Sequence, residues 1–288
     1  MHTNEKIIGF IGTGYMGSRF VQKLLASGYT VNVYNRTKEK AEPLVNIGAI
    51  LKDSVEELTT SSDIIMSSLF KDDAVEEMYL GENGVMSFIK PGSIIIELSS
   101  IKPETSRKIY ENAKEKKASM LDAAISGSTP ALEKGEVIMF VGGDKEIYEK
   151  CKPLFDIFSK MSFYMGESGK GEVMKLVVNT LLGIEMAAIA EAVRLGETLG
   201  LEKSRVLAVL GNTAVVPPGL KGKLENLKQE EYPTQFKASL MEKDMDNILD
   251  EAKMHDLAMP LSEAADKEYS EVSKQNADQD FSAVFTVI

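Results

Sequence analysis

Hydrophobic and polar positions follow a regular order in the first half of the chain, where short apolar runs alternate with longer amphipathic segments. The apolar runs that predict buried strands lie at 7–11, 30–34, 63–68, 93–98, 119–124, 137–141 and 162–165. Segments with helical spacing lie between them, at 18–27, 38–47, 72–79 and 103–117. Strands that alternate with helices are typical of βαβ units and a mostly parallel sheet. The sequence therefore predicts an α/β fold with a Rossmann-type doubly wound sheet.

The pattern changes after Gly171. A long apolar segment with helical periodicity covers residues 172–199, and its small residues would permit close helix packing. Only helical patterns follow, at 203–210, 221–226, 237–255 and 260–274. We therefore predict a nucleotide-binding domain over residues 1–166. An all-helical domain for substrate binding and oligomerisation, begun by a long helix, is predicted over residues 167–288.

Composition and charge narrow the class of protein. The 288 residues include 43% hydrophobic and 27% charged residues, which is typical of a water-soluble globular chain. The formal net charge of −11 repels phosphate backbones and argues against a nucleic-acid partner. No uninterrupted apolar run reaches the roughly 20 residues of a membrane span, and no targeting peptide is apparent. The single cysteine, Cys151, excludes an internal disulfide, as is usual in a reducing compartment. From these three features we expect a cytoplasmic protein without a membrane partner.

A glycine-rich motif directly follows the first predicted strand and opens a helix. It consists of Gly12, Thr13, Gly14, Tyr15, Met16 and Gly17, which match G-x-G-x-x-G. The first glycine allows a tight turn, the second lets the backbone approach a pyrophosphate, and the third lets the helix pack against the strand. The helix N-terminus offers N–H donors to phosphate. The motif therefore predicts that these six residues bind a dinucleotide.

The end of the second predicted strand discriminates between the two nicotinamide dinucleotides. Enzymes that use NAD usually place an acidic residue there, on the ribose 2′-hydroxyl. This chain has Asn35, Arg36 and Thr37 instead. A guanidinium can bind a 2′-phosphate through two hydrogen bonds, and the neighbouring amide and hydroxyl can add others. The segment favours NADP(H), although Arg36 could also be a solvated loop cation.

Three further segments are hard to explain as scaffold alone. Ser99 and Ser100 follow a buried strand, at the edge where doubly wound sheets bind their ligands. Residues 122–128 end another strand in small, hydrogen-bonding side chains. The segment 169–179 opens the long helix and carries Lys175 and Asn179, which are four residues apart and share one helix face.

Together with the glycine-rich motif, these segments resemble the β-hydroxyacid dehydrogenase family. That family includes 3-hydroxyisobutyrate dehydrogenase, tartronate semialdehyde reductase and the glyoxylate/succinic semialdehyde reductases. The resemblance covers essentially the whole chain and continues in Lys243-Asp244-Met245 and in the segment 280–284. Ala124 stands where the family often has proline. Ser128, together with the segment 35–37, is most similar to the glyoxylate/succinic semialdehyde reductase branch.

The resemblance implies roles for individual residues. It implies that Lys175 is the catalytic lysine and that Asn179 positions the substrate beside it. It also implies that the substrate is bound by Ser100, Ser126, Gly127, Phe236 and Asp244. The residues that it adds to the cofactor site are Leu69, Phe70, Ser100 and Lys243. A homodimer or homotetramer is expected as well.

These expectations converge on an NADPH-dependent oxidoreductase that acts on a small carboxylic acid. It would reduce an aldehyde or keto acid such as glyoxylate or succinic semialdehyde to the hydroxy acid, with Lys175 as the general acid. A 3-hydroxyacid dehydrogenase working oxidatively, an imine reductase and a non-catalytic NADP-binding scaffold are the alternatives. No metal is expected, because the two histidines, His2 and His255, lie in no zinc-like spacing.

Overall fold

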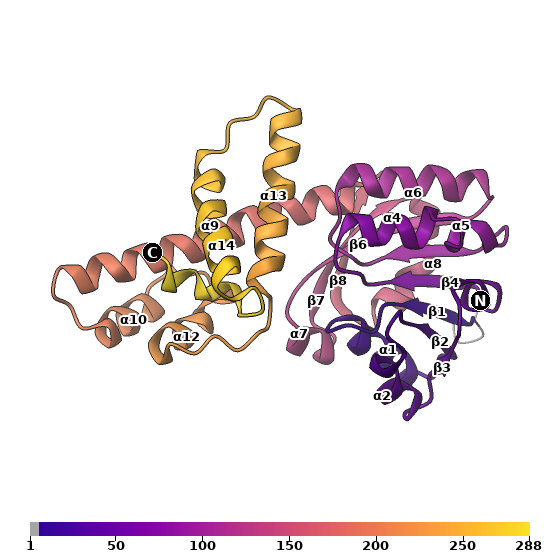
Figure 1. The fold of residues 1–288 in the computed structure, drawn as a ribbon, viewed down its shortest axis with the longest axis horizontal. Helices are drawn as coiled ribbons and strands as arrows, with labels where there is room; N and C mark the ends of the chain where they lie inside the picture. Colours follow the sequence, from indigo (N-terminus) through magenta and orange to yellow (C-terminus); the bar gives the residue numbers. More distant parts are fainter. Residues whose placement is uncertain (1–5) are drawn as a thin grey trace. The chain divides into compact units, whose positions relative to one another are not determined.

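The computed structural model describes residues 6–288 and contains two compact units. The first unit ends at Lys175 and the second begins at Leu176. The division falls within the long helix α9 (Lys170–Thr198), whose first turns belong to the first unit (Figure 1). Each unit has its own hydrophobic core.

The described part of the first unit is built on an eight-stranded sheet with the order β3-β2-β1-β4-β5-β6-β7-β8. Its strands are β1 (Ile8–Ile11), β2 (Val31–Tyr34), β3 (Ile50–Leu51), β4 (Ile64–Ser67), β5 (Ile94–Glu97), β6 (Ser119–Ser126), β7 (Val137–Gly143) and β8 (Ser159–Gly166). Neighbouring strands are parallel except for β6 and β7, which are antiparallel. The strand order reverses between β1 and β4, where doubly wound sheets bind nucleotides. The predicted fold class is confirmed.

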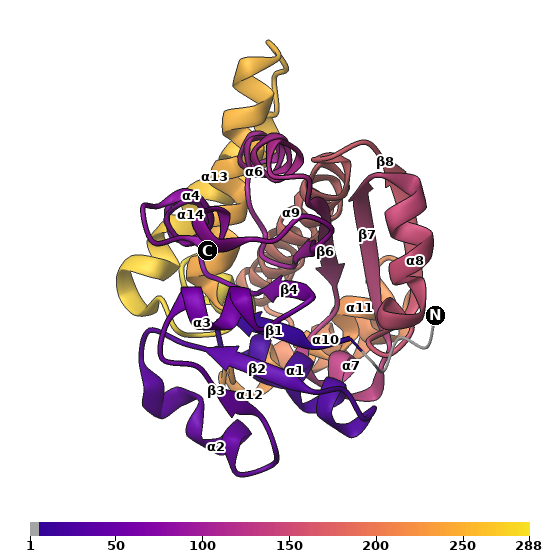
Figure 2. The same ribbon diagram turned by 90° about the vertical axis from the view of Figure 1, so that its right-hand side faces the viewer.

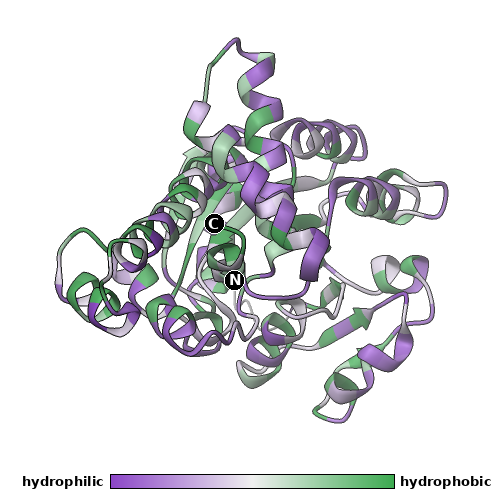
Figure 3. Ribbon diagram, turned by 60° about the vertical axis from the view of Figure 1, so that its left-hand side comes forward, coloured by the Kyte–Doolittle hydropathy of each residue, from purple (hydrophilic) through white to green (hydrophobic). Residues whose placement is uncertain are grey.

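Side chains of the central strands alternate between two cores. In β4, Ile64 and Met66 pack into one core and Ile65 packs into the other, as a two-residue period requires. Helices cover both faces of the sheet (Figure 2), and the strands are mostly hydrophobic whereas the helices alternate hydrophobic and hydrophilic positions (Figure 3). The helices that contribute to the first core are α1 (Gly17–Ala26), α2 (Glu42–Val45), α7 (Thr129–Lys134) and α8 (Lys145–Phe155). Those that contribute to the other core are α3 (Val55–Thr60), α4 (Asp72–Leu80), α5 (Val85–Phe88) and α6 (Pro103–Glu115).

Cys151 of α8 lies in the first core. The thiol is free and buried, and burial raises its pKa to about 12. A thiol with so high a pKa carries almost no thiolate at neutral pH, and thiolate is the reactive form. Cys151 is therefore a structural residue.

Several short elements were not predicted. Strand β3 has two residues, and α3 has six, which is too short for a periodic pattern to appear. Helix α3 is stabilised instead at its N-terminus: the Ser54 hydroxyl accepts from Glu57 N, and the Glu57 carboxylate accepts from Asp53 N. The single helix predicted over 38–47 is divided into a 3-10 turn (Lys38–Lys40) and α2, which has Pro43 in its first turn. Proline is tolerated there because the first N–H groups of a helix have no partner within the helix.

The second unit is helical. After α9 come α10 (Lys203–Asn212), α11 (Pro218–Lys221), α12 (Lys223–Gln229), α13 (Ala238–Met254), α14 (Pro260–Asn276) and a final 3-10 helix, η3 (Phe281–Thr286). Helices α13 and α14 pack against each other. Gly183 lets α9 approach them closely: a Cβ there would lie 2.9 Å from the Met245 sulfur, and the Gly183 carbonyl accepts from the Tyr269 hydroxyl at 2.9 Å.

Helix α9 corrects one expectation from the sequence. It has 29 residues and at most two charged residues in its most apolar 18-residue window, so by length and composition alone it is able to cross a membrane; 33% of that window is buried. The sequence prediction considered only uninterrupted apolar runs, whereas α9 mixes apolar, small and charged residues. A single helix of this kind is weak evidence for a membrane span.

Asp266 of α14 gives a prediction about stability. Burial, together with the carboxylates of Asp246 and Glu242, raises its pKa from 3.8 to about 6, and one of its oxygens is buried without a hydrogen-bond partner in the described chain. The raised pKa means that the folded protein binds this proton more tightly than the unfolded chain does. The contribution to stability is therefore complete below pH 4 and is lost as the pH rises through 6.

We expect Asp266→Asn to stabilise the fold above pH 6 and to leave its stability unchanged near pH 4. After allowance for the exposed part of the side chain, the gain is on the order of 1 kcal/mol. Thermal unfolding at both pH values measures the effect, with the exposed Asp256→Asn as the control. An equal effect at both pH values would show that the carboxylate is not titrating in this range.

Candidate cofactor and substrate site

The ends of four adjacent strands form one edge of the sheet. The register pairs Ile11 with both Tyr34 and Ser67, and Ser67 with Glu97, so these four residues lie in one row. The chain segments that leave this row are 12–17, 35–37, 68–70 and 98–100. The fold therefore brings together the segments of the first unit that were predicted to bind the dinucleotide, whereas Lys243 lies in the second unit.

The glycine-rich turn has the space that a pyrophosphate needs. Gly12 has a φ of +91°, and a Cβ there would lie 2.4 Å from the Ser68 carbonyl oxygen. A Cβ on Gly17 would lie 2.0 Å from the Gly12 oxygen, whereas a Cβ on Gly14 would meet no side chain or backbone atom within 4 Å beyond its chain neighbours. The Thr13 hydroxyl oxygen is buried and has no hydrogen-bond partner among the described residues. These features fit a dinucleotide phosphate as the missing neighbour of the turn.

Asn35 has a structural use in addition to the predicted one. Its side-chain oxygen accepts from Thr13 N at 3.0 Å, and its amide nitrogen donates to the Thr37 carbonyl at 2.7 Å. The amide therefore ties the glycine-rich turn to the end of β2, and its contact with a 2′-phosphate stays a prediction. Arg36 and Thr37 are both exposed at this strand end, where Arg36 supplies a guanidinium.

Glu97, which the sequence analysis missed, connects the next two segments. Its fully buried carboxylate accepts from the Ser67 hydroxyl and from Ser99 N at 2.7 Å, and burial raises its pKa. The Ser99 hydroxyl in turn accepts from Leu69 N at 2.7 Å. Leu69 is thus held against the glycine-rich turn, where its side chain would lie 2.9 Å from a Cβ on Gly12. Phe70 is exposed beside it and Ser100 is half-buried.

Asp122 in β6 fixes the beginning of α9. Its buried carboxylate accepts from Gly169 N at 2.7 Å, Gly171 N at 2.8 Å and Glu172 N at 3.2 Å. Burial raises the pKa of Asp122, and the three N–H donors oppose that shift by favouring the ionised form. Asp122 was not predicted as a site residue. Its position within an apolar strand was the available signal, because a buried charge needs partners.

Ser126 and Gly127 lie at the outer end of β6, beyond Asp122. Ser126 is half-buried and pairs with Ile138 of β7. Gly127 is exposed, with a φ of +146°, and a Cβ there would lie 2.9 Å from Val137. The pair therefore presents a hydroxyl and a backbone turn that admits only glycine without strain.

Lys175 and Asn179 lie one turn apart on α9. Lys175 is half-buried, and Asn179 is 1% exposed. The Asn179 amide nitrogen donates to Asp244, and since a carboxylate only accepts, this bond fixes the orientation of the amide. The Asn179 side-chain oxygen is buried without a hydrogen-bond partner in the described chain. It is a fixed acceptor on the same helix as the lysine.

Lys243 completes this cluster in the second unit. Its ammonium lies 3.0 Å from the second oxygen of Asp244, and its side chain is only 16% exposed. Asp244 therefore holds Asn179 with one oxygen and Lys243 with the other. Phe236, which precedes α13, is half-buried and meets Phe281 edge to face, with 5.7 Å between the ring centres.

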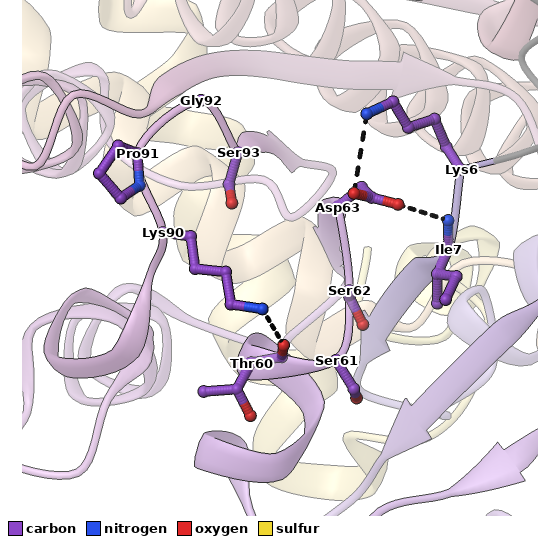
Figure 4. A pocket seen from close by; sticks show the side chains of 10 residues that line it. All are labelled: Lys6, Ile7, Thr60, Ser61, Ser62, Asp63, Lys90, Pro91, Gly92 and Ser93. Carbon is purple, nitrogen blue, oxygen red and sulfur yellow. Dashed lines mark hydrogen bonds and ion pairs between the residues drawn. The ribbon is translucent and has the colours of Figure 1, made fainter.

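A polar pocket lies at the opposite edge of the sheet. Its volume is about 360 Å³, and the residues that line it precede β1, β4 and β5 (Figure 4). Its charged groups have partners within the protein: Lys90 donates to the Thr60 carbonyl, and Lys6 lies 3.7 Å from Asp63. Among residues 6–288, no three histidine, cysteine or acidic side chains group as metal ligands. His2 lies outside the described residues.

A doubly wound sheet with a glycine-rich turn at its switch point, followed by a helical domain, defines a dehydrogenase that uses a nicotinamide dinucleotide. Residues 7–166 match the family described as "NAD binding domain of 6-phosphogluconate dehydrogenase". Residues 169–288 match the family described as "NAD-binding of NADP-dependent 3-hydroxyisobutyrate dehydrogenase". The chain belongs to the β-hydroxyacid dehydrogenase family, the enzymes similar to 3-hydroxyisobutyrate dehydrogenase.

Individual relatives match nearly the whole chain. Glyoxylate/succinic semialdehyde reductase 2, chloroplastic, of Arabidopsis thaliana is 36% identical over 282 residues, 98% of this chain and 79% of that protein. The NAD-dependent L-serine dehydrogenase of Pseudomonas aeruginosa is 36% identical over 97% of this chain and 96% of that protein. The solved structure of Psf3 in complex with NADP+ and 2-OPP has a TM-score of 0.88 and 25% identity, covering 97% of this chain and 99% of that one.

Proposed function

We propose that this protein reduces a small aldehyde or keto acid, of the glyoxylate or succinic semialdehyde type, to the hydroxy acid with NADPH. The observation that carries the proposal is the pairing of Lys175 with Asn179 on α9, where Asp244 fixes the Asn179 amide. The reductase from Arabidopsis thaliana supports the substrate class, because it matches nearly the whole chain.

The residues of this chain supply the proton transfer. When bound, the reduced cofactor supplies a hydride to the carbonyl carbon of the substrate. Negative charge then grows on the carbonyl oxygen, where the Lys175 ammonium stabilises it and delivers a proton. The fixed Asn179 oxygen is an acceptor for a hydrogen from that ammonium or from the product hydroxyl. In the oxidative direction, neutral Lys175 would accept the proton of the hydroxyl.

The substrate carboxylate needs hydrogen-bond donors. The Ser126 hydroxyl, the Gly127 N–H and the Ser100 hydroxyl supply such donors at the carboxyl edge of the sheet. Hydrogen bonds to a carboxylate are stronger than those between neutral groups. This set would therefore select acids over simple aldehydes.

The preference for NADPH is attributed to the end of β2, since proteins similar to this chain differ in their cofactor: the L-serine dehydrogenase is NAD-dependent, whereas Psf3 is in complex with NADP+. Arg36 is exposed there, and none of residues 35–37 is acidic. We expect Arg36→Ala to raise the KM for NADPH about tenfold or more while the KM for NADH changes little, since a charge-assisted hydrogen bond contributes about 1.5–3 kcal/mol. Steady-state kinetics with both cofactors measures the effect. Lys40→Ala, an exposed cation nearby, is the control; equal losses with both cofactors would contradict the assignment.

The role of Lys175 is tested by Lys175→Met, which keeps the length of the side chain and removes the proton. We expect kcat to fall about 10²–10⁴-fold, the usual contribution of a general acid. NADPH binding, followed by fluorescence titration, should be unchanged. Lys170→Met, at the exposed first position of the same helix, is the matched control.

The substrates for this comparison are glyoxylate, succinic semialdehyde, tartronate semialdehyde and methylmalonate semialdehyde, with a cyclic imine beside them. A rate of Lys175→Met equal to wild type would refute the proton-transfer role. Turnover of the imine alone would identify an imine reductase. NADPH binding without turnover of any compound would identify a binding protein.

We propose further that a second copy of this chain covers the exposed apolar side of α9. Val177, Leu181, Leu195 and Leu199 are between 50% and 74% exposed. A lipid surface suits this helix poorly, because Glu185 lies near its middle and a charge there is costly in hydrocarbon. Light scattering is expected to give at least twice the 31.6 kDa of one chain, and Leu181→Glu with Leu195→Glu should lower that mass. A stable monomer, or recovery only in detergent, would refute the proposal.

A further inference from the structure

Two segments of the second unit that are far apart in the sequence lie side by side. Residues 232–238 lead into the start of α13, and residues 276–282 connect the end of α14 to the start of η3. Phe281 N donates to the Phe236 carbonyl at 2.9 Å, and Ala238 N donates to the Gln279 carbonyl at 2.8 Å. Lys237 and Asp280 form an antiparallel bridge. The segment that carries Phe236 is therefore bound along its length to the segment before η3.

The Asp280 carboxylate is the centre of this contact, and it is completely buried. One oxygen accepts from Lys223 Nζ at 2.8 Å, Gln235 N at 3.0 Å and Phe236 N at 3.1 Å. The other accepts from Ser282 N at 3.1 Å and from the Ser282 hydroxyl at 2.7 Å. A buried ion pair is costly unless its hydrogen bonds are complete, and five donors meet this carboxylate.

The arrangement also fixes an aromatic pair. Phe281 follows Asp280 directly, and its ring lies beneath the Lys223 ammonium at 5.2 Å while meeting the Phe236 ring edge to face. Asp280 thus holds Phe236 by accepting from the Phe236 backbone N–H, and Phe281 contacts the Phe236 ring. Helix α13, which carries Asp244, begins two residues after Phe236.

We propose that Asp280, with Lys223 as its counter-ion, is a positioning residue for the substrate: it fixes Phe236 and the first turn of α13. Its carboxylate is completely buried and is bound by five donors, two of them the backbone N–H groups of Gln235 and Phe236, so the route that we propose to the substrate runs through Phe236. The proposal rests on the proposed function and on the expectation, implied by the family resemblance, that Phe236 binds the substrate. It gives a role to the segment 280–284, which the proposed chemistry leaves unused.

The test begins with Asp280→Asn, which keeps the shape of the side chain and removes its charge. We expect the KM for the aldehyde acid to rise about tenfold, with kcat and the Kd for NADPH changed by less than about twofold. Asp278→Asn is the matched control, because Asp278 is an exposed acid on the same segment whose side chain joins the same two segments through a surface ion pair with Lys237, and such surface pairs contribute little. Its KM should equal that of wild type.

A double-mutant cycle separates positioning from general stability. If Asp280 acts through Phe236, then Phe236→Ala combined with Asp280→Asn should have the KM of Phe236→Ala alone. If the two substitutions raised KM independently, so that their fold-changes multiplied in the double variant, the proposal would be overturned. A lower Tm with an unchanged KM in Asp280→Asn would overturn it as well. Because Asp280→Asn leaves Lys223 buried without its counter-ion, Lys223→Gln with Asp280→Asn is a second variant that removes both charges, and its KM should remain raised.

Hydrogen–deuterium exchange gives a readout that does not depend on activity. Peptides covering 232–238 should exchange faster in Asp280→Asn than in wild type and Asp278→Asn, and unchanged exchange would overturn the proposal. If the wild type turns over no aldehyde acid, the proposed function fails while this measurement still decides whether Asp280 holds the segment. If Phe236→Ala leaves KM unchanged in an active enzyme, the proposed route from Asp280 to the substrate is refuted.

Discussion

The hydrogen bonds between the Asp122 carboxylate and the first N–H groups of α9 are the interaction on which the candidate chemistry depends. They join the sheet that carries the dinucleotide turn to the helix that carries Lys175 and Asn179. A helix N-terminus has N–H groups without partners and a positive dipole end, and a buried carboxylate satisfies both. Because an α-helix is rigid over a single turn, fixing its first residues also fixes Lys175 relative to the strand ends.

Buried carboxylates repeat this arrangement throughout the protein. Glu97 joins the loops after β4 and β5, Asp244 orients Asn179, and Asp280 holds the segment before α13. Each is almost fully buried, and each is bound by backbone N–H groups, hydroxyls, an amide or a lysine. A buried charge without partners would be strongly destabilising, so a loop that moved away would leave an unpaired carboxylate. The acids therefore favour one arrangement of the loops over its alternatives.

Much of the fold follows from the sequence, because most strands are apolar runs of four or more residues and the long helices are periodic. The glycine-rich turn could be identified because its residue types, spacing and position after a strand agree. Strand β3 and helix α3 could not be predicted, since two or six residues carry too little pattern. The Asn35 amide, the Asp122 cap and the Asp280 contacts depend on residues 22 to 57 positions away, and only the folded chain brings those together.

The division of the fold also separates the proposed proton donor, Lys175, from Phe236, one of the residues expected to bind the substrate. Lys175 lies on a helix whose start is fixed by the sheet, so its place depends little on the loops of the helical domain. Phe236 lies in a segment held by a carboxylate and a lysine from two other segments, where a few substitutions can change the shape offered to the substrate. A difference of one methylene in a pocket contributes about 1–3 kcal/mol, so such changes alter specificity modestly and leave the proton transfer intact. On this proposal, the substrate preference can change while Lys175 and Asn179 stay in place.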